Sequence, residues 1–293
     1  MDVIRTVNEM QAHADAARAE GQTLALVPTL GALHKGHLTL VRRALEEADH
    51  VTVSIFVNPT QFGPDEDYDE YPRDLEGDQE KLEALNVDAL FAPSVNEMYP
   101  YANDEALPGP LAWVSVDRLD AHLCGAYREG HFRGVTTVVT KLFHACKPDL
   151  AVFGKKDAQQ YVILQRLVET LLFDIDIVGV PTVREPDGLA TSSRNEYLSP
   201  EEREQASVLF QAVTAAEEAI NGGEQEAEAV VRAMANELAA APDGEVEYAE
   251  VVDANTLQPT DHLAPGQDVL AAVAVYFGDT RLIDNTFVEV PRA

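Results

Sequence analysis

The sequence has few cysteines and no long hydrophobic run, and each shortage excludes a class of protein. Cys124 and Cys146 are the two cysteines among 293 residues. They cannot form a disulfide framework, so a reducing compartment is expected. No apolar run approaches the roughly 18 residues of a membrane-spanning helix, and no secretory hydrophobic segment follows the N-terminus. We therefore expect a cytoplasmic protein that does not contact membranes.

Basic residues are also scarce. Lys and Arg total 21 against 51 Asp and Glu, which gives a formal net charge of −30. A nucleic-acid partner is disfavoured, because binding phosphates requires a basic surface. The acidic residues are spread along the chain, which predicts a solvated acidic surface rather than a disordered tail. Since the Debye length falls to about 3 Å at 1 M salt, this surface is consistent with a saline cytoplasm.

Strand-like and helix-like segments alternate through about the first 180 residues. Short apolar runs predict strands at residues 23–27, 51–57, 87–91, 149–153 and 175–180. Amphipathic spacing predicts helices at residues 37–48, 75–85, 134–146 and 158–173. This alternation is typical of an α/β fold with a doubly wound, mostly parallel, Rossmann-like sheet.

The pattern changes after the turn Pro186-Asp187-Gly188. Two helices are expected, at residues 200–221 and 224–240, separated by Gly222-Gly223 as a stop signal. Strands are then expected at residues 246–252 and 269–277. We therefore predict two domains, residues 1–184 and a smaller C-terminal α+β domain of residues 185–293.

The segment VPTLGALHKGH, residues 27–37, joins the first of these strands to the first of these helices. Open α/β sheets tend to bind ligands at such turns. Gly31 and Gly36 allow close backbone approach, and a helix N-terminus favours phosphate. His34 and His37 can both face one polyphosphate and stabilise charge on a leaving pyrophosphate. The alternative is a pair of exposed residues at a helix cap; zinc is disfavoured because no third ligand lies at helical spacing nearby.

Two further polar segments offer substrate-binding groups. SIFVNPTQF, residues 54–62, ends in Asn58 and Gln61, whose amides suit a small substrate with hydroxyl and carboxylate groups. GAYREGHFRG, residues 125–134, carries Arg128 and Arg133. An arginine matches phosphate or carboxylate geometry, although pairing with an acidic surface residue is the competing interpretation.

FGKKDAQQ, residues 153–160, follows a strand and opens a helix. Gly154 permits close approach to a ribose. Lys155 and Lys156 can meet phosphate, and Asp157 can accept from ribose hydroxyls. Gln160 projects from the first helical turn.

TSSRN, residues 191–195, lies in a polar loop. Ser192, Ser193 and Arg194 can clamp the β- and γ-phosphates of a nucleotide. Alone the pattern is nonspecific, and its weight depends on the other segments.

Eight segments occur in the order found in one enzyme family: VPTLGALHKGH, SIFVNPTQF, EYPRDLEGD, FAPSVNEMYP, GHFRGV, FGKKDAQQ, IVGVPTVREPDGLATSSRNEYLS and GDTRLIDN. With them the sequence resembles the pantothenate synthetase (pantoate–β-alanine ligase) family, within the His-x-Gly-His nucleotidyltransferase group. The resemblance implies an AMP-forming, ATP-dependent ligase that uses Mg²⁺ and joins pantoate to β-alanine through pantoyl adenylate. It also implies a homodimer, with nucleotide and pantoate bound by residues 1–184 and the smaller domain closing over the ATP site.

The resemblance assigns roles to individual residues. The implied ATP-binding residues are Leu30, Gly31, Ala32, Leu33, His34, Lys35, Gly36, His37, Gly154, Lys155, Lys156, Asp157, Val183, Thr191, Ser192, Ser193 and Arg194. The implied catalytic residues are His37, His34, Lys156 and Arg194. His37 is the family's proton donor, and electrostatic stabilisation by either histidine is the alternative.

Substrate and metal contacts follow from the same resemblance. Gln61 is expected to contact both pantoate and β-alanine, and Gln160 pantoate. Asn58 and Arg128 are additional substrate-binding candidates. Asp78 lies in an acidic segment of the family near the metal and phosphates, and is the candidate Mg²⁺ residue.

The sequence departs from the family pattern at three positions. Leu30 stands where methionine is common, Thr191 where methionine or leucine is common, and Glu129 where proline is common. None removes a group that the proposed chemistry requires. Two alternatives stay open: a related adenylyl-transfer enzyme that uses another acid, and a non-catalytic nucleotide-binding protein.

Overall fold

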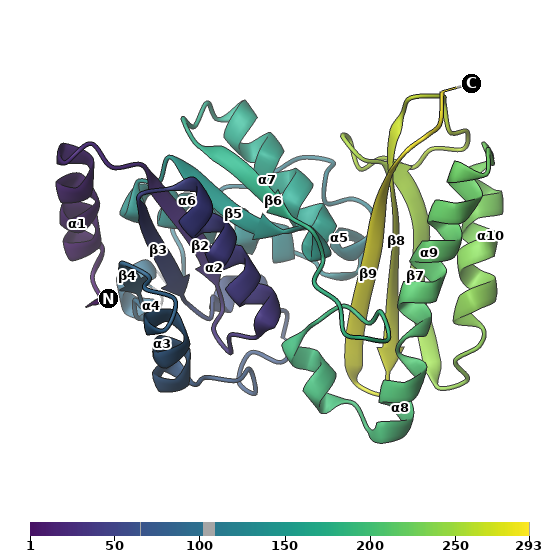
Figure 1. Ribbon diagram of the computed structural model, residues 1–293, viewed down its shortest axis with the longest axis horizontal. Coiled ribbons are helices and arrows are strands. Elements are labelled where there is room, and N and C mark those ends of the chain that lie inside the picture. The colour runs from purple at the N-terminus through teal and green to yellow at the C-terminus, as the bar shows by residue number, and fades with distance from the viewer. Residues whose placement is uncertain (65, 102–108, 293) are drawn as a thin grey trace. The chain divides into compact units, whose positions relative to one another are not determined.

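The computed structural model describes residues 1–64, 66–101 and 109–292. The chain forms two compact units (Figure 1). The first contains Met1–Val116, Arg128–Lys155 and Ile163–Val180. The second contains Asp117–Tyr127, Lys156–Val162 and Pro181–Ala293. Residues 117–127 and 156–162 thus belong to the second unit although they precede residue 184, and the domain boundary at 184 stays a prediction.

A six-stranded parallel sheet forms the centre of the first unit, in the order β1-β4-β3-β2-β5-β6. Its strands are β1 (Asp2–Ile4), β2 (Leu24–Thr29), β3 (His50–Ile55), β4 (Ala89–Phe91), β5 (Leu150–Gly154) and β6 (Asp176–Val180). The chain leaves β2 toward β3 on one side and later returns to β5 on the other. The sheet therefore has its switch point beside β2, where ligands bind in open α/β sheets.

Helices cover both faces of this sheet. They are α1 (Val7–Ala19), α2 (Lys35–Glu47), α3 (Leu75–Glu83), α6 (His131–Cys146) and α7 (Ala158–Thr170). Crossovers between parallel strands are right-handed, so α2, which leads from β2 toward β3, lies on the face opposite to α6, which leads toward β5. The packing agrees: α1 contacts α6, and α2 contacts β2, β3 and β5.

The central strands are buried on both sides, which explains their continuous apolar sequences. Residues 24–27 of β2 and 50–54 of β3 are all buried. Alternate residues of the two strands, Ala25, Val27, Val51 and Val53, share a core with Val41 and Ala44 of α2. The α/β architecture predicted from the sequence is confirmed. Strand β1 and helix α1 were not predicted. Strand β1 has three residues, which give too little periodicity to recognise.

The second unit contains an antiparallel sheet, in the order β7-β8-β9. Its strands are β7 (Gly244–Asp253), β8 (Asp268–Phe277) and β9 (Thr280–Glu289), and its longer helices are α9 (Val208–Asn221) and α10 (Ala227–Leu238). They enclose their own apolar core. The helix expected over residues 200–221 is divided into α8 (Pro200–Gln205) and α9, and β9 was not predicted.

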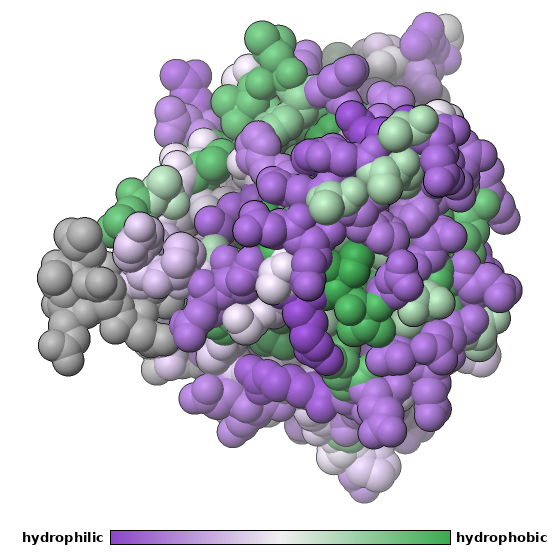
Figure 2. Space-filling view, turned by 90° about the vertical axis from the view of Figure 1, so that its left-hand side faces the viewer, coloured by the Kyte–Doolittle hydropathy of each residue, from purple (hydrophilic) through white to green (hydrophobic). Residues whose placement is uncertain are grey.

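Hydrophilic residues dominate the face in Figure 2, and the hydrophobic residues on it form small separate patches. Several acidic side chains are largely exposed, among them Asp2, Asp15 and Glu228 at 74%, 61% and 85%. Within the described residues, no helix is long and apolar enough to cross a membrane.

Candidate active site

The loop between β2 and α2 reverses the chain at the carboxyl edge of the sheet. Gly31 and Ala32 have positive φ angles of 94° and 50°. A side chain on Gly31 would press on Ile55 and Asp78, at 3.1 and 3.3 Å. Glycine therefore permits both the turn and its close approach to α3. The loop ends at His34, the N-cap of α2.

His34 and His37 form a capping box at the start of α2. Nδ1 of His34 accepts from the Gly36 N–H at 3.1 Å, and Nδ1 of His37 accepts from the His34 N–H at 3.4 Å. The two rings stack with centroids 4.0 Å apart. A ring nitrogen that accepts a hydrogen bond carries no hydrogen, so each neutral imidazole carries its hydrogen on Nε2. The pair thus presents two Nε2–H donors at the N-terminus of a helix, where the positive end of the helix dipole favours phosphate.

Asp78 of α3 lies under this loop. Its side chain is 1% exposed. Oδ1 accepts from the Leu33 N–H at 2.7 Å and from Lys81 Nζ at 3.2 Å, and Lys81 also donates to the Leu33 carbonyl at 2.9 Å. Oδ2 is buried without a hydrogen-bond partner. An unsatisfied buried carboxylate oxygen is costly unless a ligand or ion completes it.

Asn58 is the N-cap of the short helix η1 (Pro59–Gln61), which follows β3. Gln61 is the last residue of this helix. Asn58 Nδ2 donates to Gln61 Oε1 at 3.0 Å, so the structure brings these two predicted residues together. Helix η1 packs directly on α6 at Gly134, where a Cβ atom would lie 2.1 Å from the Thr60 carbonyl oxygen. Glycine at 134 is what lets η1 sit this close.

Arg128 lies in the same region and forms an ion pair with Glu66. It makes two hydrogen bonds to Glu66, of 2.7 and 2.6 Å, and one contact of 3.0 Å to His131 Nε2. His131 Nδ1 lies 2.7 Å from the Gln61 carbonyl oxygen. Burial acts to raise the pKa of Glu66, but the hydrogen bond and charge of Arg128 outweigh it and the pKa is lowered. Arg133, by contrast, lies over the ring of Trp113, 4.4 Å from its centroid.

The other predicted ATP-site residues follow β5 and β6. Gly154 ends β5 and Lys155 begins the short helix η2 (Lys155–Asp157). Both belong to the first unit. The remaining ATP-site candidates belong to the second unit, namely Lys156, Asp157, Val183, Thr191, Ser192, Ser193 and Arg194. The pantoate-binding candidate Gln160 belongs to the second unit as well.

Within the second unit, the turn before Thr191 is held by several contacts. Arg184 makes a two-pronged ion pair with the buried Asp284, at 2.6 and 3.0 Å. The Thr191 N–H donates to the Val183 carbonyl at 2.9 Å, which joins two predicted residues. Ser192 then caps the short helix η3 (Ser193–Tyr197) by accepting from the Arg194 N–H at 3.3 Å. Arg194 is therefore the second residue of a short helix and not part of an irregular loop.

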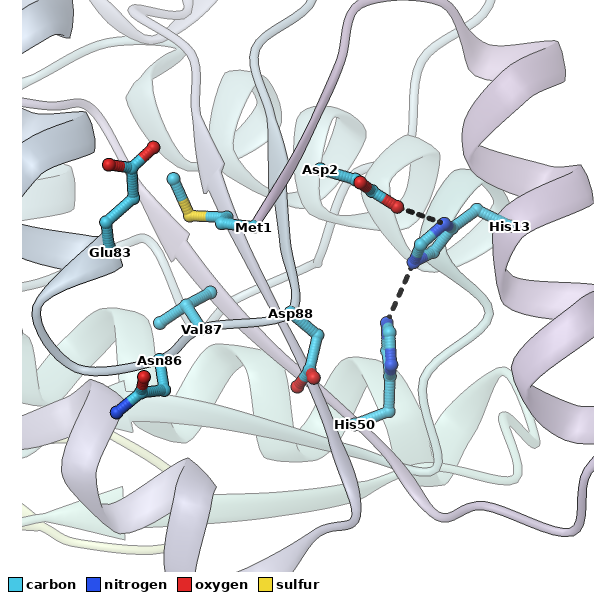
Figure 3. Close-up of a pocket in the computed structure, with 8 residues that line it drawn as sticks. All are labelled: Met1, Asp2, His13, His50, Glu83, Asn86, Val87 and Asp88. Carbon is cyan, nitrogen blue, oxygen red and sulfur yellow. Dashed lines mark hydrogen bonds and ion pairs between the residues drawn. The ribbon is translucent and has the colours of Figure 1, made fainter.

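A separate polar pocket of about 370 Å³ lies at the amino edge of the parallel sheet (Figure 3). His13 and His50 face each other there with Nε2 atoms 3.0 Å apart, and Asp2 lies 3.7 Å from His13. Burial lowers the pKa of His50, although the nearby carboxylate of Asp88 opposes this. None of the predicted site residues lines this pocket.

Sequence reasoning missed Tyr99, His131 and Glu66, which contact the predicted residues Asn58, Gln61 and Arg128. Tyr99 and His131 do lie inside the quoted segments FAPSVNEMYP and GHFRGV, which is the one signal that points to them. Among the residues that the structure describes, no three His, Cys, Asp or Glu side chains are grouped to hold a metal ion by themselves.

Comparison with known proteins identifies the family. The family model for pantoate–β-alanine ligase matches residues 2–287. A pantothenate synthetase of Salinibacter ruber is 84% identical over 293 residues, covering 100% of this chain and 99% of the relative. One of Thermotoga petrophila is 50% identical over 288 residues, covering 98% and 100%.

Solved structures agree. Pantothenate synthetase from Thermus thermophilus has a TM-score of 0.88 and 44% identity, covering 99% of this chain and 100% of its own. A pantoate–β-alanine ligase from Francisella tularensis, complexed with β-γ ATP and β-alanine, has a TM-score of 0.78 and 31% identity, covering 98% and 97%. The chain belongs to the pantoate–β-alanine ligase family.

Proposed function

We propose that this protein joins pantoate to β-alanine in a reaction driven by ATP, forming pantothenate, AMP and pyrophosphate. A pantoate carboxylate oxygen attacks the α-phosphorus of ATP, and the bond to pyrophosphate breaks. The amine of β-alanine then attacks the carbonyl carbon of pantoyl adenylate, loses a proton, and displaces AMP. The observation that carries this proposal is the pair of Nε2–H donors at the N-terminus of α2, in a chain of this family.

The α2 N-terminus supports the first step. As the bond to the α-phosphorus breaks, negative charge grows on the departing pyrophosphate. His34 and His37 present donors whose positions are set by the capping box before ATP arrives, so little reorganisation is needed. Donation of a hydrogen bond is sufficient for this role, and transfer of the proton from His37 is the competing interpretation.

Asp78 is the residue proposed to hold Mg²⁺ with the ATP phosphates. Mg²⁺ prefers oxygen ligands and is commonly bound by one or two carboxylates together with substrate phosphates. The buried, unpartnered Oδ2 of Asp78 beneath the 30–34 loop fits such an ion. When bound, the ion neutralises phosphate charge. Oδ1 meanwhile fixes the loop through the Leu33 N–H.

The remaining site residues keep the roles that the family resemblance gives them, as proposals. Gln61 contacts pantoate and β-alanine, and Gln160 contacts pantoate. Asn58 and Arg128 are substrate-side residues; the hydrogen bonds described above occupy both, so we propose that they act by fixing their neighbours as much as by direct contact. Lys156, Arg194 and the ATP-binding residues of the second unit are proposed to bind the nucleotide.

The direct test is the reaction order. Pantoate alone should stimulate exchange of labelled pyrophosphate into ATP, and β-alanine alone should not. AMP should accumulate only when both are present, and other acid–amine pairs should give little. If a different acid supports exchange better than pantoate, the protein is a related adenylyl-transfer enzyme; if no acid does, it is not an adenylating ligase.

The histidine pair can be tested separately. His34→Ala and His37→Ala should each slow exchange by about 10²-fold or more, which is typical of removing a preorganised donor. His262→Ala, at an exposed histidine, is the matched control and should behave as wild type. His37→Gln retains donor and acceptor atoms. Near-complete activity in that variant would favour hydrogen bonding, and inactivity equal to His37→Ala would favour proton donation.

We further propose a homodimer and a cytoplasmic location. Cys124 and Cys146 are both free thiols and both buried, which suits a reducing compartment. Light scattering during size exclusion should give twice the monomer mass of 32.0 kDa. A monomeric mass at assay concentration would contradict the dimer.

A further inference from the structure

The buried amide of Asn58 has a fixed orientation. The residue is 0% exposed. Its Nδ2 lies 3.3 Å from the Gly134 carbonyl oxygen and 3.0 Å from Gln61 Oε1. A main-chain carbonyl can only accept, so the atom beside it must be the amide nitrogen. Both Nδ2 hydrogens are therefore directed to protein acceptors.

Two hydroxyl groups hold the other end of this amide. Tyr99 donates from its hydroxyl to Asn58 Oδ1 at 2.8 Å, and Thr60 Oγ1 lies 2.9 Å from the same oxygen. The two hydroxyls are 3.1 Å apart. Tyr99 comes from the end of the short helix α4 (Val95–Met98), 41 residues from Asn58 in sequence, and is 2% exposed. Burial raises the pKa of Tyr99, so its hydroxyl keeps its hydrogen throughout the neutral range.

These contacts set which end of Gln61 faces outward. Asn58 holds Gln61 Oε1, so Nε2 with its two hydrogens is the opposite end of the amide. The main-chain carbonyl oxygen of Gln61 is held as well, by His131 Nδ1 at 2.7 Å. An ionised carboxylate oxygen of a substrate can only accept hydrogen bonds, so it requires a donor. An amide rotated by half a turn would place Oε1 against that oxygen, which is repulsive.

We propose that Tyr99 is a positioning residue for pantoate binding, which acts through Asn58 to keep the Nε2 end of Gln61 directed at the substrate. The inference rests on the proposed function and adds a residue to it. The ring of Tyr99 packs near that of Phe56, with their centroids 6.2 Å apart. Nζ of Lys141 lies over the Tyr99 ring, 5.2 Å from its centroid. A phenylalanine would preserve this packing, so what tyrosine adds is its hydroxyl.

The first experiment is Tyr99→Phe, measured by pantoate-dependent ATP–pyrophosphate exchange. Loss of one hydrogen bond should allow Asn58 and Gln61 to sample wrong orientations. The KM for pantoate should rise about three- to tenfold, in the range of one lost hydrogen bond. The KM for ATP should stay within about twofold of wild type. Equal losses for both substrates, or an unchanged pantoate KM, would overturn the inference.

A double-mutant cycle separates positioning from a general structural effect. Gln61→Ala removes the side-chain amide whose orientation Tyr99 is proposed to control. In that background, Tyr99→Phe should change the pantoate KM by less than about twofold, because residues that act through one another are not additive. If the effects multiply instead, Tyr99 does not act through Gln61.

Tyr248→Phe is the matched control. Tyr248 is also a buried tyrosine, 6% exposed, and its hydroxyl lies 3.2 Å from Cys124 Sγ in the second unit. This variant should lose thermal stability to a similar extent and leave the pantoate KM unchanged. A pantoate KM raised equally in both variants would show a nonspecific effect and overturn the inference.

A second hydroxyl provides an independent variant. Should Tyr99→Phe fail to fold, Thr60→Val removes the other hydroxyl at Asn58 Oδ1 and is expected to raise the pantoate KM in the same way; an unchanged KM there contradicts the inference. If the wild-type protein shows no pantoate-dependent exchange, the proposed function fails. If wild type is active and Tyr99→Phe is indistinguishable from it, only the role of Tyr99 fails.

Discussion

Gly134→Ala is the substitution for which the structure makes the sharpest prediction. Gly134 lies in the first turn of α6, where alanine would ordinarily stabilise the helix by about 1 kcal/mol. The added Cβ atom would lie 2.1 Å from the Thr60 carbonyl oxygen and 2.7 Å from the Gln61 Cα atom. Both neighbours are backbone atoms, so no side-chain rotation relieves the clash.

The size of the effect follows from that distance. Real Cβ contacts essentially never fall below 3.0 Å, so α6 and η1 must separate by about 0.9 Å. Overpacking of this kind costs about 1–3 kcal/mol, and the gain in helix propensity offsets part of it. The net loss of stability should be about 0–2 kcal/mol. A displacement of about 1 Å in a positioning segment, however, can cost about 10²-fold in rate. Activity should therefore fall far more than stability.

The assay is kcat/KM for pantoate in the exchange reaction, together with the urea-unfolding free energy. Gly63→Ala is the control, because its Cβ atom would meet nothing closer than Glu66 Cγ at 3.7 Å. That variant should match wild type in both measurements. If Gly134→Ala is as active as wild type, whatever its stability, then the close packing of η1 on α6 does not position Gln61 and the reasoning is wrong.

Three other predictions concern the metal, pH and salt. Asp78→Asn keeps an acceptor for the Leu33 N–H but removes the charge, so the Mg²⁺ concentration for half-maximal exchange should rise; an unchanged requirement would remove Asp78 from the metal site. Burial lowers the pKa of His50 against the opposing charges of Asp88 and Asp2, so the unfolded state binds more protons and stability should fall as pH drops below about 6.5. His50→Gln should flatten this fall in urea unfolding between about pH 7.5 and 5, and an equal slope in both proteins would contradict the assignment. With a net charge of −30, the melting temperature should rise from dilute buffer to about 1 M KCl as repulsion is screened, and a salt-independent value would argue against an acidic surface under strain.

The sequence alone determined the features that depend on neighbours along the chain. Strands β2, β3 and β5 can be recognised in the sequence as continuous apolar runs, because both faces of a central parallel strand are buried. The turn at residues 30–37, which we propose to bind phosphate, could also be predicted from the sequence, because a glycine-containing turn and a helix cap are local structures. Among the elements that were not predicted, β1 has three residues and so little local signal, whereas α1 and β9 are longer.

Only the tertiary structure decided how the predicted substrate-binding residues are held. Asn58 meets Gly134 across 76 residues, and Arg128 meets Glu66 across 62. No periodicity or spacing encodes such contacts, because they depend on which elements the sheet brings together. From the sequence, Gln61 is predicted to be a substrate-binding amide. Which end of that amide faces outward depends on a carbonyl of α6 and, through Asn58, on the hydroxyl of Tyr99, and a hydrogen-bond donor and acceptor can be told apart only once their partners are in place.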